Sequence, residues 1–312
     1  MVTPSYQQGA YIEETIRSVI EQGYPNLEYI IIDGGSTDAS VEIIKKYADS
    51  LTYWVSEPDD GQTDAINKGL HKATGDIVAW LNSDDVYLPG TLQAIAEAFI
   101  ADPKLEIAYG DVENFFPDGR NQVSVNDFEL LDFLSRVSIH QPGVFWKREL
   151  HDRLGYLDPS FYYLMDYDLW ARLFMNCKHQ HIDKVLTRFR VHNEAKTGNN
   201  PPGLYMDYRR VISRLLNSLP YTDLKDKAIQ LGIYSNEEDV QYPLSIPPAK
   251  GVMDAAFNTY VMNCIVQEYT FGHWASTNKL IVNSMGSGPV ANKLKFLVKN
   301  NMGLGILKSQ GK

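Results

Sequence analysis

Two adjacent carboxylates, Asp84 and Asp85, follow the apolar run Ile77–Leu81 in the stretch DIVAWLNSDDVYLPG. Like charges side by side repel each other, and an isolated charge near a protein core is costly to desolvate. The pair therefore indicates either a solvated turn or the ligands of a cation. Carboxylates with neighbouring oxygen donors suit Mg²⁺ or Mn²⁺. Such an ion would hold a diphosphate, which a chain of net charge −10 otherwise repels.

A second group of carboxylates lies in the stretch MDYDLWARLF, whose apolar spacing predicts a helix. Asp166 would either cap the start of this helix or act as a general base, since one carboxylate near an acceptor hydroxyl is enough for proton removal. Asp168 is spaced to pair with Arg172 one helical turn later. The helix start is therefore a candidate catalytic position or a capped and paired terminus.

The elements that must position these residues alternate between strand and helix. Apolar runs at residues 27–32, 52–58 and 77–81 are separated by segments with helical periodicity. This alternation predicts an α/β fold with a mostly parallel, Rossmann-like sheet and helices on both faces. Ligands bind beyond the carboxyl ends of the strands in such sheets. The polar residues at those ends are Pro4–Tyr6, Asp33, Glu57–Asp60 and Asn82–Asp85.

The alternating pattern does not extend over the whole chain. Strand and helix signals become mixed after about residue 103, and the stretch NNPPG marks a boundary near residue 200. Most of the remaining sequence has helical periodicity. We therefore predict an α/β domain over residues 1–200 and a mainly helical extension over residues 201–312.

The composition excludes several classes of protein. The negative net charge argues against a nucleic-acid-binding surface. The two cysteines, Cys177 and Cys264, fit no zinc-ligand spacing. No leader-like segment precedes the first element, and no apolar run reaches the ~20 residues that span a bilayer. These features predict a cytoplasmic protein, and the basic C-terminal stretch from Val290 predicts either a solvated helix or peripheral contact with the inner face of the membrane.

Three stretches, taken in order, resemble glycosyltransferase family 2. They are VTPSYQQGAYIEETIRSVIEQGYPNLEYIIIDGGSTDAS, DDGQTDAINKGLHKATGDIVAWLNSDD and YLMDYDLWARL, and the resemblance covers about residues 1–198. It implies the GT-A fold and inverting transfer of a sugar from a nucleotide sugar. Family members usually carry several more apolar residues before Val2, so we expect a short first strand.

The resemblance also implies roles for the candidate carboxylates. Asn82, Ser83 and Asp84 stand where the family has its Asp-x-Asp metal motif, so Asp84 would be the main carboxylate for Mn²⁺ or Mg²⁺, and Asp85 would support the loop. His192 would either complete the metal site or be a structural histidine. Asp166 would be the catalytic base, with Asp168 structural. Asn82 and Met165 depart from the family pattern, because each replaces a customary acid.

The nucleotide site is implied in the same way. A carboxylate at Asp33 would accept a hydrogen bond from the imide N–H of uracil or thymine, or would only build the turn before the next helix. This favours uridine or thymidine diphosphate donors over guanosine. The predicted donor-site residues are Thr3, Pro4, Ser5, Tyr6, Asp33, Asp60, Gln62, Ser83 and Asp84. His140 and Gln141 are predicted on the acceptor side.

The function that follows is an inverting glycosyltransferase. It would move a sugar from a uridine or thymidine diphosphate sugar to a hydroxyl of a glycan or lipid-linked acceptor, in the assembly of surface polysaccharide. The alternative is a non-catalytic sugar-nucleotide-binding relative, because both departures fall in catalytic motifs. A dinucleotide-dependent oxidoreductase is excluded, since no Gly-x-Gly-x-x-Gly turn follows the first strand.

Overall fold

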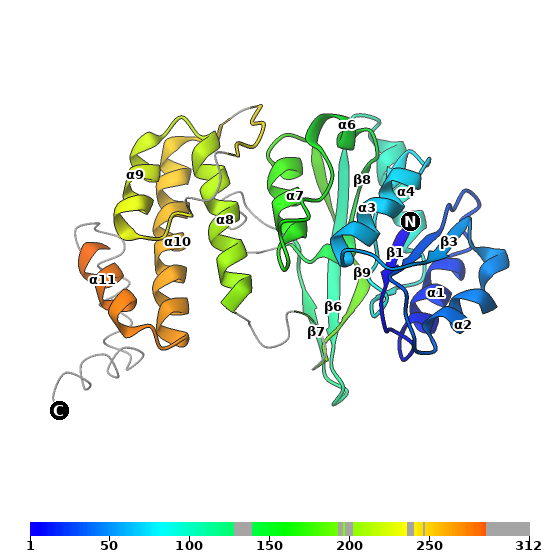
Figure 1. The fold of residues 1–312 in the computed structure, drawn as a ribbon. Coiled ribbons are helices and arrows are strands. Elements are labelled where there is room, and N and C mark those ends of the chain that lie inside the picture. The colour runs from blue at the N-terminus through cyan, green and yellow to red at the C-terminus, as the bar shows by residue number, and fades with distance from the viewer. Residues whose placement is uncertain (128–138, 193–195, 197–201, 236–239, 246, 285–312) are drawn as a thin grey trace. The chain divides into compact units, whose positions relative to one another are not determined.

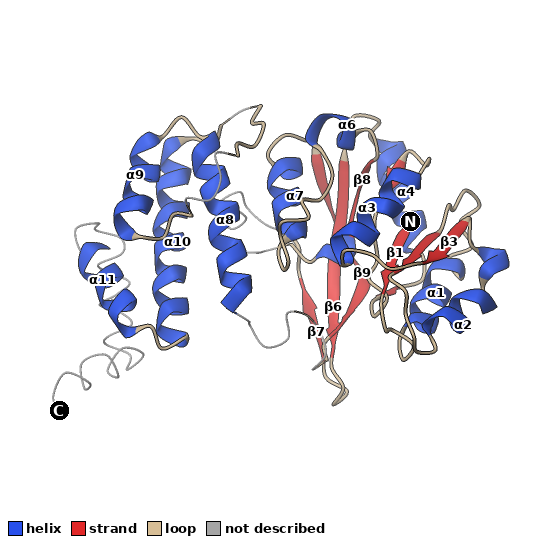
Figure 2. Cartoon of the chain, in the orientation of Figure 1, coloured by secondary structure: helices blue, strands red, loops and turns tan. Residues whose placement is uncertain are grey.

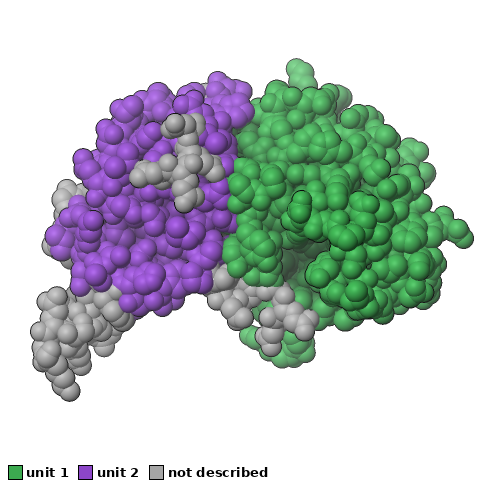
Figure 3. Space-filling model, viewed as in Figure 1, with its two compact units in different colours: residues 1–127, 139–201 green, residues 128–138, 202–312 purple. Residues whose placement is uncertain are grey.

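The computed structural model describes residues 1–127, 139–192, 196, 202–235, 240–245 and 247–284. The chain divides into two compact units (Figure 3). Unit 1 comprises Met1–Asp127 and Ile139–Pro201, and unit 2 comprises Phe128–Ser138 and Pro202–Lys312. The boundary predicted near residue 200 lies close to the start of the second segment of unit 2.

Unit 1 begins with a three-stranded parallel sheet in the order β1–β2–β3. The strands are β1 (Val2–Ser5), β2 (Ile30–Asp33) and β3 (Tyr53–Ser56), and the helices that connect them are α1 (Ile12–Ile20) and α2 (Ser40–Lys46), with a short 3₁₀ turn at Ala48–Ser50. Every residue of β1 and β2 is buried, which explains their near-continuous apolar sequence. Helix α3 (Gln62–Lys72) follows β3. The register sets Ser5 opposite Asp33 and Asp33 opposite Ser56, so three polar side chains meet at the carboxyl end of the sheet.

The second sheet of unit 1 is mixed, in the order β4–β8–β6–β9–β5, with β7 paired to β6 (Figure 1). The pair β6–β9 is parallel and the other pairs are antiparallel. Its strands are β4 (Ile77–Val78), β5 (Val86–Tyr87), β6 (Ile107–Phe115), β7 (Asn121–Ser124), β8 (Val144–Lys147) and β9 (His179–Arg190). The parallel arrangement predicted from the sequence therefore holds for the first sheet and for one pair of the second.

The apolar run before the two carboxylates was predicted to form one strand, but only its first two residues belong to a strand of the second sheet. Only Ile77 and Val78 pair with β8, and the main chain then changes partner. Val2 donates its N–H to the carbonyl of Ala79 at 3.0 Å, and Leu81 donates to the carbonyl of Val2 at 2.9 Å. Residues 79–81 therefore join the second sheet to β1, and they deliver the Asp84 turn to the edge where β1 and β2 end.

An aromatic cluster connects this run to the helix that carries Asp166. The rings of Trp80 and Trp170 stack with centroids 5.5 Å apart, and Trp146 contacts both edge to face. All three side chains are at most 1% exposed. Trp170 lies in α7 (Met165–Phe174), so its packing fixes that helix relative to the Asp84 turn. The remaining helices of unit 1 are α4 (Thr91–Ala101), α6 (Leu150–Leu154) and a 3₁₀ turn at Gln141–Gly143.

The described residues of unit 2 are mainly helical (Figure 2). Its helices are α8 (Pro202–Ser218), α9 (Thr222–Leu231), α10 (Lys250–Thr270) and α11 (Trp274–Ser284). The basic C-terminal stretch, with Lys293, Lys295, Lys299, Lys308 and Lys312, lies outside the described residues. Within the part of the chain that is described, none of the helices combines the length and the apolar character that a membrane crossing requires.

Candidate functional site

The carboxylate of Asp33 is fully buried at the point where three parallel strands end. One of its oxygens accepts from the hydroxyls of Ser5 and Ser36, at 2.9 and 2.6 Å. The other accepts from the Ser36 N–H and the Ser56 hydroxyl, at 2.8 and 2.7 Å. These donors satisfy a charge that burial would otherwise make costly. Asp33 therefore builds the turn after β2, and its additional role toward a nucleotide base stays a prediction.

The loop after β1 is fastened to the loop after β2. The N–H groups of Gln7, Gln8 and Gly9 donate to side chains of Ser36, Ser40 and Asp38, each at 2.8 Å. Tyr6, at the start of this loop, is 61% exposed and presents its ring to solvent at the edge of the sheet. A rigid loop with an exposed ring is a suitable surface for a planar base. The other predicted residues of this strand, Thr3 and Pro4, are buried within β1.

Asp84 and His192 meet directly. The Nε2 atom of His192 lies 3.0 Å from Oδ2 of Asp84, with the side chains 9% and 22% exposed. The other ring nitrogen of His192, Nδ1, is buried and has no hydrogen-bond partner among the described residues. One face of the imidazole packs against Tyr11, with centroids 4.9 Å apart. The structure thus brings together the two residues predicted as metal ligands.

The 3.0 Å between these two atoms is the length of a direct hydrogen bond or ion pair, and it is also the spacing that two ligands of one octahedral cation would have. Adjacent ligands in an octahedral shell with bonds of about 2.1 Å are roughly 3.0 Å apart, which is the separation of these two atoms. Among the described residues, no cluster of three or more histidine, cysteine or acidic side chains could hold a metal ion. A magnesium-like ion commonly takes one or two protein ligands, with substrate phosphates and water completing its shell. The arrangement therefore suits an ion that binds together with a diphosphate.

Asp85 supports the turn, as predicted. Its side chain is fully buried, and Oδ1 accepts from the Arg190 N–H at 3.0 Å. Its carbonyl accepts from the Thr15 hydroxyl at 2.8 Å. Burial, and then the neighbouring charge of Asp84, raise the pKa of Asp85 well above its usual range. The adjacent carboxylates therefore differ in environment, with Asp84 accessible and Asp85 enclosed.

A chain of amides extends from the Asp84 turn. Oδ1 of Asn82 accepts from the Gln62 amide at 3.0 Å. The Asn82 Nδ2 group donates to Gln141 at 3.3 Å and, at 3.4 Å, to Asp85. Gln141 in turn donates to the carbonyl of Trp80 at 2.7 Å, and Lys196 donates to Gln62 at 3.2 Å. An amide at position 82 thus donates to a buried acid, which an ionised carboxylate at this position could not do.

We expect Asn82→Asp to destabilise the protein. The new carboxylate would lose both donor contacts and would face Asp84 and Asp85, so its folded-state pKa would rise above its unfolded value. The free energy of unfolding should fall by about 1–3 kcal/mol at pH 8, and the loss should shrink as the pH falls toward about 5 and the carboxyl is protonated. Urea unfolding at both pH values checks this, with the exposed Asn121→Asp as control. An Asn82→Asp variant as stable as the wild type, with tighter Mn²⁺ binding, would contradict it.

Asp166 is the second residue of α7 and is not its N-cap. Its Oδ1 atom accepts from the N–H of Tyr167 at 2.7 Å. Burial raises the pKa of Asp166 to about 6, although hydrogen bonds from the main chain and the charge of Lys196 act in the opposite direction. A carboxylate with a pKa near neutrality is suited to accept a proton from an acceptor hydroxyl. The adjacent Met165 is buried in the apolar core, where the acid customary in the family would lack solvent.

Asp168 has the structural role predicted for it. Its carboxylate is buried and pairs with Arg172 at 2.8 Å. The guanidinium of Arg172 also donates to the carbonyls of Leu154 and, at 2.8 Å, Tyr156. Arg172, oriented by this ion pair, therefore connects α7 to the end of α6 and to the segment that follows it.

In the loop after β3, Asp59 is more buried than Asp60, whose predicted donor-site role stays a prediction. Asp60 is exposed, and its N–H donates to Asp64 at 3.2 Å. Asp59 is half-buried, and a Cβ added to Gly34 would lie 2.7 Å from its Oδ2 atom. Burial raises the pKa of Asp59 above its usual range. The glycine pair Gly34–Gly35 directly after Asp33 leaves room for the Asp59 carboxylate beside the main chain.

Three further predicted residues, Ser83, His140 and Gln141, are enclosed to different extents. Ser83 is buried within the turn before Asp84. His140 is half-buried, its N–H donates to the Asn126 side chain at 3.1 Å, and burial lowers the pKa of its imidazole. Gln141 reaches Asn82, which places it one contact away from the Asp84 turn. The acceptor-side role of both His140 and Gln141 stays a prediction.

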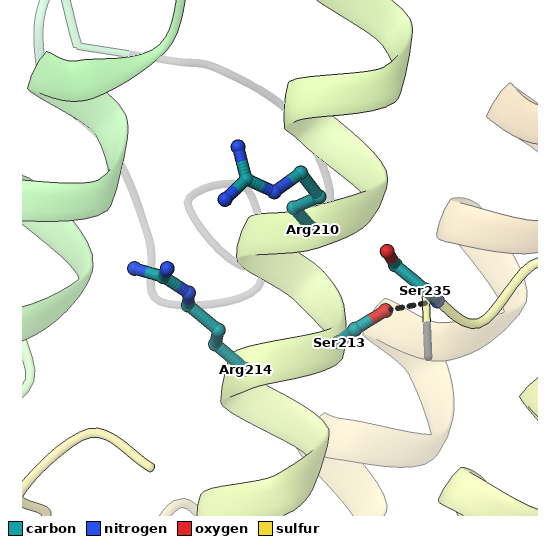
Figure 4. Close-up of a pocket in the computed structure, with 4 residues that line it drawn as sticks. All are labelled: Arg210, Ser213, Arg214 and Ser235. Atoms are coloured by element: carbon teal, nitrogen blue, oxygen red, sulfur yellow. Dashed lines mark hydrogen bonds between the residues drawn. The ribbon is translucent and has the colours of Figure 1, made fainter. Parts of the chain in front are cut away.

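Unit 2 contains a separate, shallow polar hollow lined by Arg210, Ser213, Arg214 and Ser235 (Figure 4). Arg210 and Arg214 extend from α8 in one direction, whereas the Ser213 hydroxyl accepts from the N–H of Ser235 at 2.9 Å. Both arginines already have partners within the protein, including Asp207 at 3.6 Å from Arg210. We therefore assign no part of the reaction to this hollow.

Comparisons with known proteins identify the family of this chain. The profile of Glycosyl transferase family 2 matches residues 1–157. An uncharacterized glycosyltransferase of Rickettsia typhi is 30% identical over 231 residues, which are 70% of this chain and 71% of the relative. The family match covers the segments that hold Asp33, Asn82 and Asp84.

Solved structures share the fold. TarS of S. aureus in complex with UDP-GlcNAc superposes with a TM-score of 0.56 at 21% identity, over 73% of this chain and 69% of that one. A mannosyltransferase from Pyrobaculum calidifontis in complex with GDP-Man and Mn²⁺ gives 0.54 at 20% identity, over 97% and 79%. The chain therefore belongs to glycosyl transferase family 2 and is a glycosyltransferase of the GT-A fold.

Proposed function

We propose that this glycosyltransferase moves a sugar, with inversion, from a uridine or thymidine diphosphate sugar to a hydroxyl of a glycan or lipid-linked acceptor. The observation that carries the proposal is the contact between Asp84 and His192 in the same unit as Asp166, a carboxylate whose pKa is raised to about 6. Structures of the same fold carry UDP-GlcNAc in one case and GDP-Man with Mn²⁺ in another, which supports a nucleotide-sugar donor and a divalent cation.

Different residues of this chain would carry out different parts of the reaction. Asp84 and His192 would hold a divalent cation, which supplies positive charge to the diphosphate as it departs. Asp166 accepts the proton of the acceptor hydroxyl while the oxygen of that hydroxyl forms its bond to the anomeric carbon. The bond from that carbon to the diphosphate oxygen breaks, and the electron pair leaves with the diphosphate. One displacement of this kind inverts the anomeric configuration.

The choice of nucleotide rests on the edge formed by β1 and β2. The ring of Tyr6 would lie against the base, and Asp33 or the nearby half-buried Asp59 would accept from its imide N–H. A carboxylate accepts from uracil or thymine at that position and offers no donor to their carbonyls. A role in surface polysaccharide assembly, at the inner face of the membrane, completes the proposal.

Titration calorimetry tests the donor site. We expect uridine or thymidine diphosphate to bind in the presence of Mn²⁺ and more weakly in its absence. Asp84→Asn should weaken the metal-dependent binding at least ~10-fold, because it removes the charged ligand. Asp118→Asn is the control, since Asp118 pairs with Arg120 on the exposed β6–β7 hairpin. Folded protein that binds none of the nucleotides would overturn the proposal, and preference for guanosine diphosphate would overturn the assigned base.

A further inference from the structure

Arg190, the last residue of β9, holds the Asp84 turn through both its main chain and its side chain. Its N–H donates to Oδ1 of Asp85 at 3.0 Å, and its Nε group donates to the carbonyl of Asp84 at 2.9 Å. The antiparallel pair β5–β9 sets Val86 opposite Arg188, which brings the end of β9 beside this turn. The turn is therefore held by a residue 106 positions after Asp84 in the chain.

The guanidinium of Arg190 is held in one orientation. It forms an ion pair with Glu14 and lies over the rings of Tyr11 and Phe115, at 5.0 and 4.4 Å from their centroids. Its side chain is 18% exposed. The guanidinium group is thus stacked on two rings and hydrogen-bonded through two of its nitrogens. The conformation of the Arg190 side chain is therefore already fixed before any ligand binds.

The same contacts reach the second metal ligand. His192 lies two residues after Arg190 and packs against Tyr11, the ring that also contacts the guanidinium. Arg190 thus fixes Asp84 through a hydrogen bond to its carbonyl, and it fixes His192 through the shared ring. It also places a positive charge beside two adjacent carboxylates, which reduces their mutual repulsion.

We propose that Arg190 is a positioning residue for the divalent cation of the donor site. In this role it would act through Asp84 and His192, whose facing atoms lie 3.0 Å apart, and would not itself be a ligand of the cation. The inference rests on the proposed function, because it assumes that these two residues bind a metal ion. Residues that orient metal ligands typically affect metal affinity by about 10–100-fold when they are replaced.

The chain offers a matched control in Arg188. It lies on the same face of β9, stacks on the same Phe115 ring at 4.4 Å, and pairs with Glu113 at 2.7 Å. The difference is that its Nε group donates to Glu113, whereas that of Arg190 donates to the Asp84 turn. Arg188→Gln therefore removes the same kinds of contact as Arg190→Gln, namely an ion pair and stacking on Phe115. It leaves the hydrogen bonds from Arg190 to the Asp84 turn in place.

The experiment measures Mn²⁺ affinity by the loss of the free-ion paramagnetic resonance signal, with uridine diphosphate present. We expect Arg190→Gln to weaken Mn²⁺ binding by about 10–100-fold, and Arg188→Gln to change it by less than about 3-fold. At saturating Mn²⁺, kcat of Arg190→Gln should recover most of its value, because no group that touches the substrate is lost. Circular dichroism and thermal unfolding establish that each variant is folded at the assay temperature.

If Arg190→Gln does not fold, the Mn²⁺ affinity of Arg190→Lys is measured instead. This variant keeps the charge and loses the planar fork, so we expect Mn²⁺ binding about 10-fold weaker than in the wild type. Equal Mn²⁺ affinity in the Arg190 and Arg188 variants, or wild-type affinity in Arg190→Lys, would overturn the role of Arg190 alone. A folded wild-type protein that binds no Mn²⁺ with any nucleotide would overturn the proposed metal site and this inference together.

Discussion

Replacing Asp166 by asparagine should lower kcat at least ~100-fold, because general base catalysis commonly contributes about 10²–10⁴ in rate. The amide keeps a similar shape and can still accept from the N–H of Tyr167, but it cannot take the proton of the acceptor hydroxyl. Nucleotide affinity should change little, since the donor-site residues are untouched. Steady-state kinetics and calorimetry on the same preparation separate these two quantities.

The pH dependence of the wild type gives an independent check. Asp166 must be ionised to act as a base, so log(kcat/KM) should rise with pH and level off above a pKa of about 6. The stability effect has the opposite sign. Burial raises the folded-state pKa of this carboxyl, so ionisation costs the native state stability once the pH exceeds the unfolded value of about 4. Asp166→Asn should therefore unfold at a higher temperature than the wild type at pH 8, with a smaller difference near pH 5.

An Asp166→Asn variant that retains more than about a tenth of the wild-type kcat would remove Asp166 from the role of base. Asp168→Asn is not a neutral comparison, because it breaks the buried pair with Arg172 and should destabilise the fold. Asp152→Asn, at an exposed position of α6, is the better control.

Replacing Trp170 by alanine should lower the free energy of unfolding by about 3–5 kcal/mol, because it empties the centre of the cluster with Trp80 and Trp146. Trp170→Phe should cost much less. Phenylalanine keeps a ring against Trp80, and it removes an indole N–H that is buried without a partner among the described residues. Urea unfolding, with the slope and the midpoint compared, measures both.

The tryptophan cluster also supports the site, so stability and activity should fall together. The carbonyl of Trp80 accepts from Gln141, which holds Asn82 in turn. Trp170→Ala should therefore reduce kcat at temperatures where the variant is still folded, whereas Trp170→Phe should not. Equal losses of stability in the two variants would show that ring packing at this position is not the source of the stabilisation.

The sequence was sufficient to predict the positions of Asp33 and Asp84, because polar residues directly after buried strands can be recognised without tertiary information. It also indicated that Asp168 would pair with Arg172, since their spacing on a helix is fixed. Both predictions depend on local geometry alone. The roles of Asp166 and His192 came from the resemblance, and the structure adds their surroundings.

Other features could not be predicted because they depend on long-range contacts or on loop conformation. Asn82 contacts Gln141, which is 59 positions away, and nothing local to either residue indicates this. The choice between Asp59 and Asp60 depends on a loop that passes through Gly61, whose φ is +103°. Adjacent side chains point in different directions in such a loop, so the residue type alone does not show which acid turns inward.

Because the Asp84 turn contacts residues far along the chain, these contacts can form only late in the synthesis of the protein. Asp84 and His192 are 108 positions apart, and both Arg190 and the parallel strand pair β6–β9 must be in place before they meet. Pairing of strands that are distant in sequence is slow, because a long loop must close first. A nascent chain that has emerged only as far as β8 should therefore be unable to retain a divalent cation at this position. If Asp84 and His192 bind a cation as proposed, they would do so only after β9 has left the ribosome, which separates the onset of activity from the folding of the first sheet.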